Sequence, residues 1–389
     1  MIYIITILIL LVLIFHYDVN EKSQNKMTAY YILMCWYIAI SAFQYSMGSD
    51  MPGYMNEYND THWKDISWNT LLGFNNRQFG WILLMNLSKL LSNDFVFLKT
   101  IQAIFVNVIF FQFFKRQTKA IFTSILLYSI YLYLDFNLNL MRQSIAVAIF
   151  LLGYRYYTDK SWLKYYIIVF ISIMFHNSAI VLLFLPILQL LKINKKSLVL
   201  LSISILAFLL SIRLLPLTDL LLNSLTILIK SDIFMLAELY LNNEKYGHSN
   251  VPLISFLLLS LLYLWTIFFN YRYNLFNSTS DLLIVFTYLF IMILNSSIPI
   301  FNRFNLYFAP ILISILSNFT IFYPKIKLPN FSKSFIFFFI IIFSYSSINA
   351  LFQINTSYGD RQIVQFYPYY SVFNKKISPQ RAMLWKSYY

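Results

Sequence analysis

Residues 95–114 of this chain read FVFLKTIQAIFVNVIFFQFF and residues 120–137 read AIFTSILLYSIYLYLDFN, with the basic segment KRQTK between them. A helix needs about 20 predominantly apolar residues to cross about 30 Å of hydrocarbon. Helices are required there because lipid cannot satisfy backbone N–H and C=O groups. Both stretches therefore predict transmembrane helices, and the basic segment predicts a short loop at one membrane surface.

The composition of the whole chain agrees with this reading. Of 389 residues, 59% are hydrophobic and 11% are charged, and the mean hydropathy is +0.65, whereas soluble domains carry roughly 25% charged residues. A water-soluble fold is therefore excluded. The net charge of +14 comes from basic clusters scattered between apolar runs, which indicates orientation and lipid-headgroup contact and not a nucleic-acid surface. Cys35 is the one cysteine, so a disulfide framework is excluded.

Apolar runs recur along the chain and predict an all-α, polytopic membrane helical bundle of about 12 spans. The runs are residues 1–15, 28–46, 95–114, 120–137, 140–157, 163–175, 177–191, 197–212, 250–270, 281–300, 303–323 and 334–352. The two runs around His176 are short, so residues 163–191 form two short spans, one long helix or a re-entrant hairpin. We find no internal repeat or low-complexity linker, and we treat residues 1–389 as a single membrane domain.

Charge in the loops predicts the orientation. Basic residues outnumber acidic ones in alternate short loops, which the positive-inside rule assigns to the cytoplasm. These basic residues are Lys22, Lys26, Lys115, Arg116, Lys119, Arg155, Lys160, Lys164, Lys192, Lys195, Lys196, Arg272, Lys325, Lys327 and Lys333. Both termini then face outward, together with the loops 47–94 and 213–249 and the tail 353–389. Within the first loop, residues 79–91 predict a helix at the interface.

Known soluble-enzyme motifs are missing from the sequence. It contains no Gly-rich phosphate loop, no H-E-x-x-H pair and no G-x-S-x-G elbow, so nucleotide hydrolysis, zinc chemistry and serine hydrolysis have no support. We expect no metal and no cofactor. The remaining candidates are ionisable residues at helix ends or inside apolar runs, where their cost in a membrane makes each a functional hypothesis.

Arg142 is the first such candidate. Asn139 lies three and four residues before Arg142 and Gln143, so these side chains share one helix face at the start of the run 140–157. The planar fork of arginine matches phosphate oxygens, and the two amides add donors. The alternative is an arginine that snorkels to the interface or pairs with Asp135.

Two further arginines stand beside amides. Arg303 follows Asn302 at the mouth of the run 303–323. The predicted topology places it at the outer level with Arg142, where the two could hold a single diphosphate. Arg77 is a candidate for a third cation. Interfacial anchoring is the alternative role for Arg303 and loop solvation the alternative for Arg77.

Two residues are candidates for a general base. His176 lies in the middle of an apolar stretch, where imidazole is either a proton acceptor or a hydrogen-bonded core residue. Asp50 ends the second span on the predicted outer side. If a short helix follows, Asp50, Tyr54 and Glu57 share a face, whereas the nearby glycines and proline favour a turn in which Asp50 caps backbone amides.

At these residues the chain resembles the EpsG family, polytopic proteins of bacterial exopolysaccharide and capsule gene clusters related to Wzy-type polymerases. The matching features, in family order, are Gly48-Ser-Asp50 with Tyr54, Asn139-x-x-Arg142-Gln143-Ser-Ile-Ala146, Phe175-His176-Asn-Ser178-Ala179, Arg303 and Tyr367-Pro-Tyr369. The family often has an Arg shortly before its Gly-x-Asp, and here that stretch reads Phe43-Gln-Tyr-Ser-Met. Any phosphate role of that position is therefore lost or passed to Arg77.

The resemblance implies a polymerase that joins oligosaccharide repeats carried on undecaprenyl diphosphate at the outer face of the bacterial cytoplasmic membrane. It also implies relatedness to GT-C membrane glycosyltransferases and cooperation with other polysaccharide export proteins. Such chemistry needs cations at the leaving diphosphate, for which Arg142, Arg303 and Arg77 are candidates, and a base such as His176 or Asp50. A flippase of the same lipid-linked sugars, a glycan ligase and an acyltransferase are the competing classes. The absence of a repeat and the outer-level charges favour the polymerase.

Overall fold

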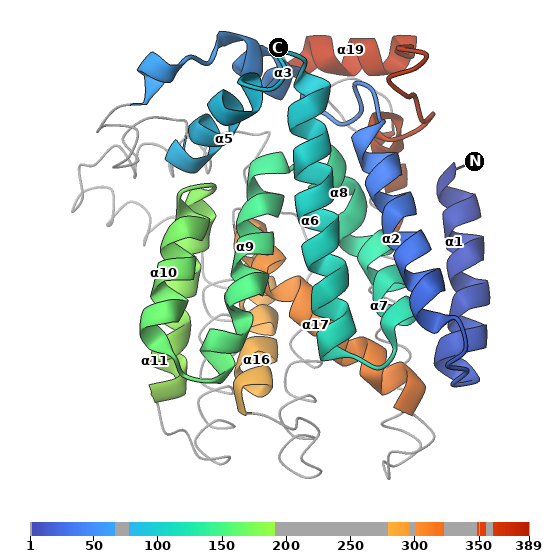
Figure 1. Cartoon of the computed structure of the whole chain (residues 1–389), viewed down its shortest axis with the longest axis vertical. Helices are drawn as coiled ribbons and strands as arrows, with labels where there is room; N and C mark the ends of the chain where they lie inside the picture. The colour runs from blue at the N-terminus through green and yellow to red at the C-terminus, as the bar shows by residue number, and fades with distance from the viewer. Residues whose placement is uncertain are drawn as a thin grey trace, which may run out of the picture. The chain divides into compact units, whose positions relative to one another are not determined.

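The computed structural model of the chain is built from helices (Figure 1). It describes residues 2–66, 78–190, 279–295, 301–322, 348–349, 351–354 and 361–388. In these ranges extended pairing is confined to two isolated bridges, Gln44 with Ser371 and Ile354 with Arg361. The prediction of an all-α fold is confirmed for this part of the chain. The contacts divide it into two compact units, Met1–Ile180 with Ile313–Tyr389 and Val181–Leu312.

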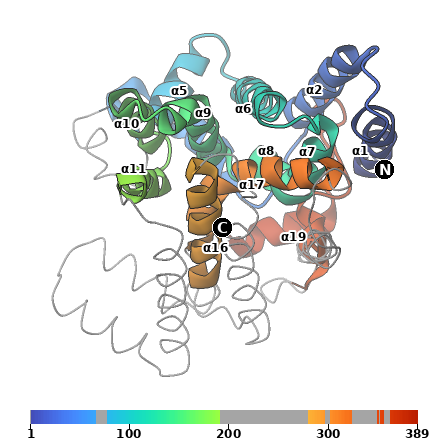
Figure 2. The same ribbon diagram turned by 90° about the horizontal axis from the view of Figure 1, so that it is seen from below.

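Unit 1 contains a row of helices that run side by side (Figure 2). In order across the row they are α1 (Ile2–Leu13), α2 (Lys26–Ala42), α6 (Phe95–Gln117), α9 (Met141–Thr158) and α10 (Trp162–Ile173). The closest neighbours are α2 with α6, α6 with α9, and α9 with α10. Where α9 meets α10 the helices approach closely, because a Cβ on Gly153 would lie 2.5 Å from Ile168 Cγ2.

The run 120–137 folds into one interrupted helix packed against this row. It consists of α7 (Ile121–Tyr128), the π-helical turn η3 (Ser129–Tyr133) and α8 (Leu134–Leu138). Aromatic rings fill the space between it and α6: the ring of Tyr128 stacks on Phe110 with centroids 5.0 Å apart. Two residues, Asn139 and Leu140, then separate α8 from α9.

Within the residues that the structure describes, three segments are long and apolar enough to cross a membrane, namely Ile2–Val19, Phe95–Gln117 and Ile121–Leu138. Side chains such as Leu8, Val12 and Phe170 are apolar and exposed on the outside of α1 and α10. Lipid is the solvent in which such surfaces are stable. The chain is therefore a membrane protein, while the total of about 12 spans stays a prediction.

One end of unit 1, called here the polar end, is covered by short helices that cross the ends of the long ones (Figure 1). These are α3 (Met51–Asp60), α5 (Phe79–Lys89) and α19 (Pro379–Tyr388). The predicted helix over residues 79–91 thus forms as α5 and ends two residues earlier. The short 3-10 helix η2 (Trp63–Asp65) follows α3, and a second one, η6 (Gln362–Gln365), precedes α19.

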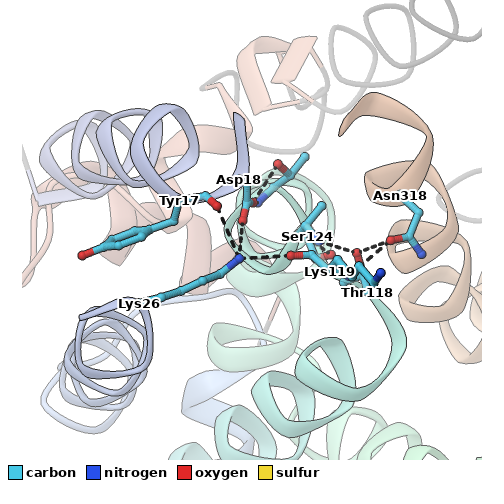
Figure 3. A network of polar contacts seen from close by, with 9 residues as sticks. Tyr17, Asp18, Lys26, Thr118, Lys119, Ser124 and Asn318 are labelled. Carbon is cyan, nitrogen blue, oxygen red and sulfur yellow. Dashed lines mark hydrogen bonds and ion pairs between the residues drawn. The ribbon is translucent and has the colours of Figure 1, made fainter. Parts of the chain in front are cut away.

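The opposite end, called the basic end, holds the loops 20–25, 118–120 and 159–161. Lys26 Nζ donates to the Lys119 carbonyl at 3.2 Å and forms an ion pair with Asp18 at 3.4 Å, which ties the first two loops together (Figure 3). Arg116 and Arg155, beside the second and third loops, line one cavity of 210 Å³. The three basic loops therefore share one end, as the alternating assignment predicts.

The α-helices of unit 2 that the structure describes come from three segments. These are α11 (Leu185–Leu190), α16 (Thr279–Asn295) and the first part of α17 (Asn302–Phe322), which continues into unit 1. Within it α11 packs on α16, and Gln189 Nε2 donates to Ser280 Oγ at 3.0 Å.

The structure corrects some predicted boundaries. Helix α2 ends at Ala42 and not at 46, because the next residues pair with the C-terminal tail: Tyr45 N donates to the Tyr370 carbonyl at 2.9 Å. Residues 163–191 are not one long helix, since α10 ends at Ile173 and a 3-10 helix, η4 (Asn177–Phe184), follows the turn at His176. The predicted runs 197–212 and 250–270 and the loop 213–249 lie outside the described residues, as does almost all of 334–352.

Candidate functional site

Arg142 lies in the first turn of α9, directly after the break that separates α8 from α9. Its Nη1 donates to Gln78 Oε1 at 3.0 Å, and its guanidinium carbon lies 5.7 Å from the centroid of the Tyr54 ring. Its Nε is buried and has no hydrogen-bond partner among the described residues. A buried donor without a partner is costly unless a ligand or water completes it. Arg142 is therefore a fixed cation with a donor available to an anion.

Helices α3 and α5 form the wall beside Arg142. Tyr54 and Glu57, one turn apart on α3, face Trp81 of α5: Trp81 Nε1 donates to Glu57 Oε2 at 3.1 Å, and the Tyr54 and Trp81 rings meet edge to face at 5.5 Å. Trp81 is fully buried. We call Arg142, Gln78, Tyr54, Glu57 and Trp81 the Arg142 cluster. The charges of Glu57 and Asp50 act on Arg142 and help to keep its guanidinium in place.

His176 is connected to the same helix turn. Its Nδ1 lies 2.6 Å from Ser178 Oγ and accepts the backbone N–H of Ser178 at 3.3 Å, while Gln143 Nε2 donates to Ser178 Oγ at 3.3 Å. Gln143 is the neighbour of Arg142 in sequence. Because a backbone N–H can only donate, Nδ1 is an acceptor here, and the neutral imidazole carries its proton on Nε2. In this arrangement the ring offers a donor at Nε2 and not a base.

Asp50 lies at the start of α3, beside a tight turn. Gly48 has φ +95°, and a Cβ there would collide with the Leu138 carbonyl oxygen and Asn139 Oδ1. This close approach lets Ser49 N donate to Asn139 Oδ1 at 2.8 Å, and Ser49 Oγ donates to Asp50 Oδ1 at 3.1 Å. Of the two interpretations of this segment, the helix is the one observed. Asp50 occupies the N-cap position of α3, yet its side chain makes no cap hydrogen bond.

The C-terminal tail completes this part of the site. Asn139 Nδ2 donates to Gln365 Oε1 at 3.2 Å, and Trp385 Nε1 of α19 donates to the Gly48 carbonyl at 3.1 Å. Arg381 is fully buried and donates from Nε to the Val364 carbonyl and from Nη2 to the Pro368 carbonyl, at 3.1 and 2.8 Å. Burial lowers the pKa of this guanidinium. The tail thus packs as an ordered wall against the Gly48 turn.

The structure brings five predicted residues to the polar end of unit 1. The five are Asp50, Asn139, Arg142, Gln143 and His176. Asn302 and Arg303 are exposed in the first turn of α17, in unit 2, so their joint action with Arg142 stays a prediction. Arg77 lies outside the described residues. Arg142 does not pair with Asp135 in the described structure, where its Nη1 donates to Gln78 Oε1 instead.

The sequence analysis assigned no role to several residues that the structure places at or beside this site. They are Gln78, Ser178, Gln365 and Lys99. Lys99 could have been found, because an ionisable residue inside an apolar run is a functional candidate. Gln78 stands next to Arg77 in the same segment, whereas nothing local in the sequence connects Gln365 with Asn139.

The described residues contain no cluster of His, Cys, Asp and Glu able to hold a metal ion. A multi-helix membrane protein whose cation, amides and carboxylates gather at the end opposite its basic loops is the class that this fold and site define. The chain belongs to the EpsG family, whose family model matches residues 27–371. That range covers every element of the Arg142 cluster. No curated protein and no solved structure matches the chain.

Proposed function

We propose that this protein is a polysaccharide polymerase of the bacterial cytoplasmic membrane. It transfers an oligosaccharide repeat from a lipid diphosphate carrier, undecaprenyl diphosphate, to the end of another repeat at the outer face. The observation that supports this most is the setting of Arg142: a cation oriented by Gln78 and Tyr54, with a buried Nε that has no partner in the described structure. Membership of the EpsG family supports a role in polysaccharide biosynthesis.

The reaction needs few protein groups. The acceptor hydroxyl oxygen attacks the anomeric carbon, the bond from that carbon to the diphosphate oxygen breaks, and the departing diphosphate takes the electron pair. Arg142 stabilises the charge that develops on the leaving group. Arg303 and Arg77 are proposed as further cations, with Asn139, Gln143 and Asn302 as supporting donors.

The hydroxyl proton goes to a base, and the geometry favours Asp50 over His176. A carboxylate at the start of α3 has acceptor capacity beyond its contact with Ser49. In the observed hydrogen-bond pattern the proton of His176 is on Nε2, so we assign this residue as a hydrogen-bond donor to the diphosphate. His176 could act as the base only after its hydrogen bonds rearrange to leave Nε2 unprotonated.

Exposed aromatic rings at the polar end suit the sugar portion of the substrate. Trp63 in η2 is half exposed, and Phe373 in the tail is 81% exposed and packs on Phe43 with ring centroids 5.4 Å apart. Such rings can stack on the apolar faces of sugars. The lipid tail of the carrier would remain in the bilayer beside the exposed apolar faces of the helices.

Reconstitution tests the proposal. Purified protein in liposomes is supplied with lipid diphosphate-linked repeats, and products are separated by length. A ladder of longer lipid-linked glycans is the expected result. Movement of the donor across the bilayer without elongation would assign a flippase, transfer only to a different acceptor a ligase, and acyl transfer to the sugar an acyltransferase.

A further inference from the structure

Lys99 is a lysine buried inside a helix long enough to cross the membrane. It lies on α6, its side chain is 1% exposed, and it is among the largest fully buried side chains in the described chain. Its ammonium group donates to Gln102 Oε1 at 2.8 Å and to the Asn137 carbonyl. Within the described residues it forms no ion pair. A buried ammonium without a carboxylate is costly enough to require a reason.

The contacts of Lys99 lead to the point where α8 ends. Asn137 is in the last turn of α8, and Gln102 Nε2 donates to the carbonyl of its neighbour Phe136 at 3.1 Å. Carbonyls in the last turn of a helix have no partner within that helix. A cation there is favoured by the helix dipole and satisfies these acceptors directly. Lys99 and Gln102 together therefore cap the C-terminus of α8.

The same pair also reaches the next helix. Gln102 Nε2 donates to Ser144 Oγ of α9 at 2.9 Å, and Ser144 lies two residues after Arg142. The side chain of Asn137 is fixed as well: it accepts from Asn107 Nδ2 at 2.8 Å and donates to Tyr128 OH at 3.0 Å. Side chains of α6 therefore hydrogen-bond to the last turn of α8 and to the first turn of α9, on either side of the break between these helices.

We propose that Lys99 is a positioning residue for the reaction proposed above: it fixes the α8–α9 break and thereby sets the place of Arg142 in its cluster. Only Asn139 and Leu140 separate the two helices, so the geometry of the break decides where the first turn of α9 points. A misplacement of about 1 Å at a catalytic group can cost about 100-fold in rate. We call the contacts of Lys99 and Gln102 with the end of α8 and with Ser144 the clamp. The catalytic consequence rests on the proposed function, whereas the clamp itself does not.

The clamp is tested without any substrate. Lys99→Met keeps the length of the side chain and removes its charge and its donors, and Lys115→Met on the same helix, at the basic end, is the matched control. Hydrogen–deuterium exchange is followed in detergent. The expected result is faster exchange at residues 139–145 with residues 148–157 unchanged, and no local change in the control. Unchanged exchange, or a uniform loss of protection over α6 and α9, would overturn the clamp.

The catalytic consequence is measured separately. We expect Lys99→Met to lower kcat by about 100-fold while the KM for donor changes little and Tm stays close to wild type; Lys115→Met should keep its rate. Full activity despite faster exchange at the break would overturn the positioning role. If wild type does not elongate at all, the proposed function fails while the exchange result still decides the clamp. If Lys99→Met does not accumulate, Gln102→Leu is used instead, because it removes the contacts with the Phe136 carbonyl and Ser144 and keeps the ammonium on the Asn137 carbonyl. Faster exchange at residues 139–145 and a lower kcat are expected, and wild-type behaviour in both would overturn the proposal.

Discussion

At the scale of single residues, the site depends on one guanidinium in an unusual setting. Arg142 is held by an amide and an aromatic ring and acted on by two carboxylates, yet one of its donors has no partner among the described residues. A simple interfacial arginine would extend its charge toward water. The observed contacts instead hold the planar guanidinium in one orientation. Recognition of phosphate oxygens by two parallel hydrogen bonds requires such an orientation.

Arg142→Lys should therefore fail to restore polymer. A lysine keeps the positive charge but cannot donate to Gln78 and to two phosphate oxygens as a planar fork. We expect Arg142→Lys to resemble Arg142→Ala, with elongation lowered by about 100-fold or more, as for the loss of an oriented donor in other enzymes. Polymer length is compared at matched protein levels, with exposed Arg155→Lys as the control. Normal polymer from Arg142→Lys would reduce Arg142 to an interfacial charge.

The roles of Asp50 and His176 can be separated by one substitution at each residue. Asp50→Asn retains the hydrogen bond from Ser49 Oγ but removes basicity, so it should slow transfer by about 100- to 10,000-fold if Asp50 is the base. His176→Ala should weaken binding of the lipid-linked donor substrate and lower the transfer rate less than Asp50→Asn does, because the ring supplies a hydrogen bond to the diphosphate. Transfer rate and membrane abundance are measured together. If both variants are abundant and fully active, neither residue acts in proton transfer.

At the scale of elements, hydropathy predicts what depends on local composition. The runs 95–114 and 140–157 appear as α6 and α9 within a few residues at each end, and Asn139, Arg142 and Gln143 do gather, because helical spacing brings them together. The π-helical turn in residues 129–133 and the contact of Gln365 with Asn139 could not be predicted. They depend on packing between residues far apart in sequence, and no local pattern encodes it.

The turn at Gly48 is the element on which the α8–α9 break and the tail converge. Gly48→Ala should destabilise the protein by roughly 1 to 3 kcal/mol, because an L-residue is strained at φ +95° and its Cβ would collide with the Leu138 carbonyl. Gly53→Ala, inside α3, is the control and should be neutral or stabilising by roughly 0.5 to 1 kcal/mol. Thermal unfolding in detergent measures both. Equal stability of the two variants would contradict the close packing of this turn.

At the scale of the whole molecule, unit 1 has chemically different ends. The basic loops lie at one end, and helices α3 and α5, which flank Arg142, lie at the other (Figure 1). The positive-inside rule assigns the basic end to the cytoplasm. Arg142, Asp50 and His176 would then work at the outer face, where lipid-linked repeats are expected to be joined.

Impermeant thiol labelling tests this orientation in intact cells. In a Cys35→Ser background, Asn93→Cys lies in the exposed turn before α6 at the polar end, and Ser23→Cys lies in the loop between α1 and α2 at the basic end. We expect labelling of Asn93→Cys and protection of Ser23→Cys, with both labelled after permeabilisation. The reverse pattern would place the Arg142 cluster in the cytoplasm and contradict an outer-face reaction.

The most direct test of the central claim is the stoichiometry of the reconstituted reaction. Wild type and Arg142→Ala, inserted in liposomes at equal amounts, are given lipid diphosphate-linked repeats, and glycosidic bonds formed and free lipid diphosphate released are counted together. The predicted result for wild type is a ladder of products with one lipid diphosphate released for each new bond, and for Arg142→Ala a loss of both by about 100-fold or more. Elongation at the wild-type rate by Arg142→Ala, or donor consumption by wild type without longer glycans, would contradict the account.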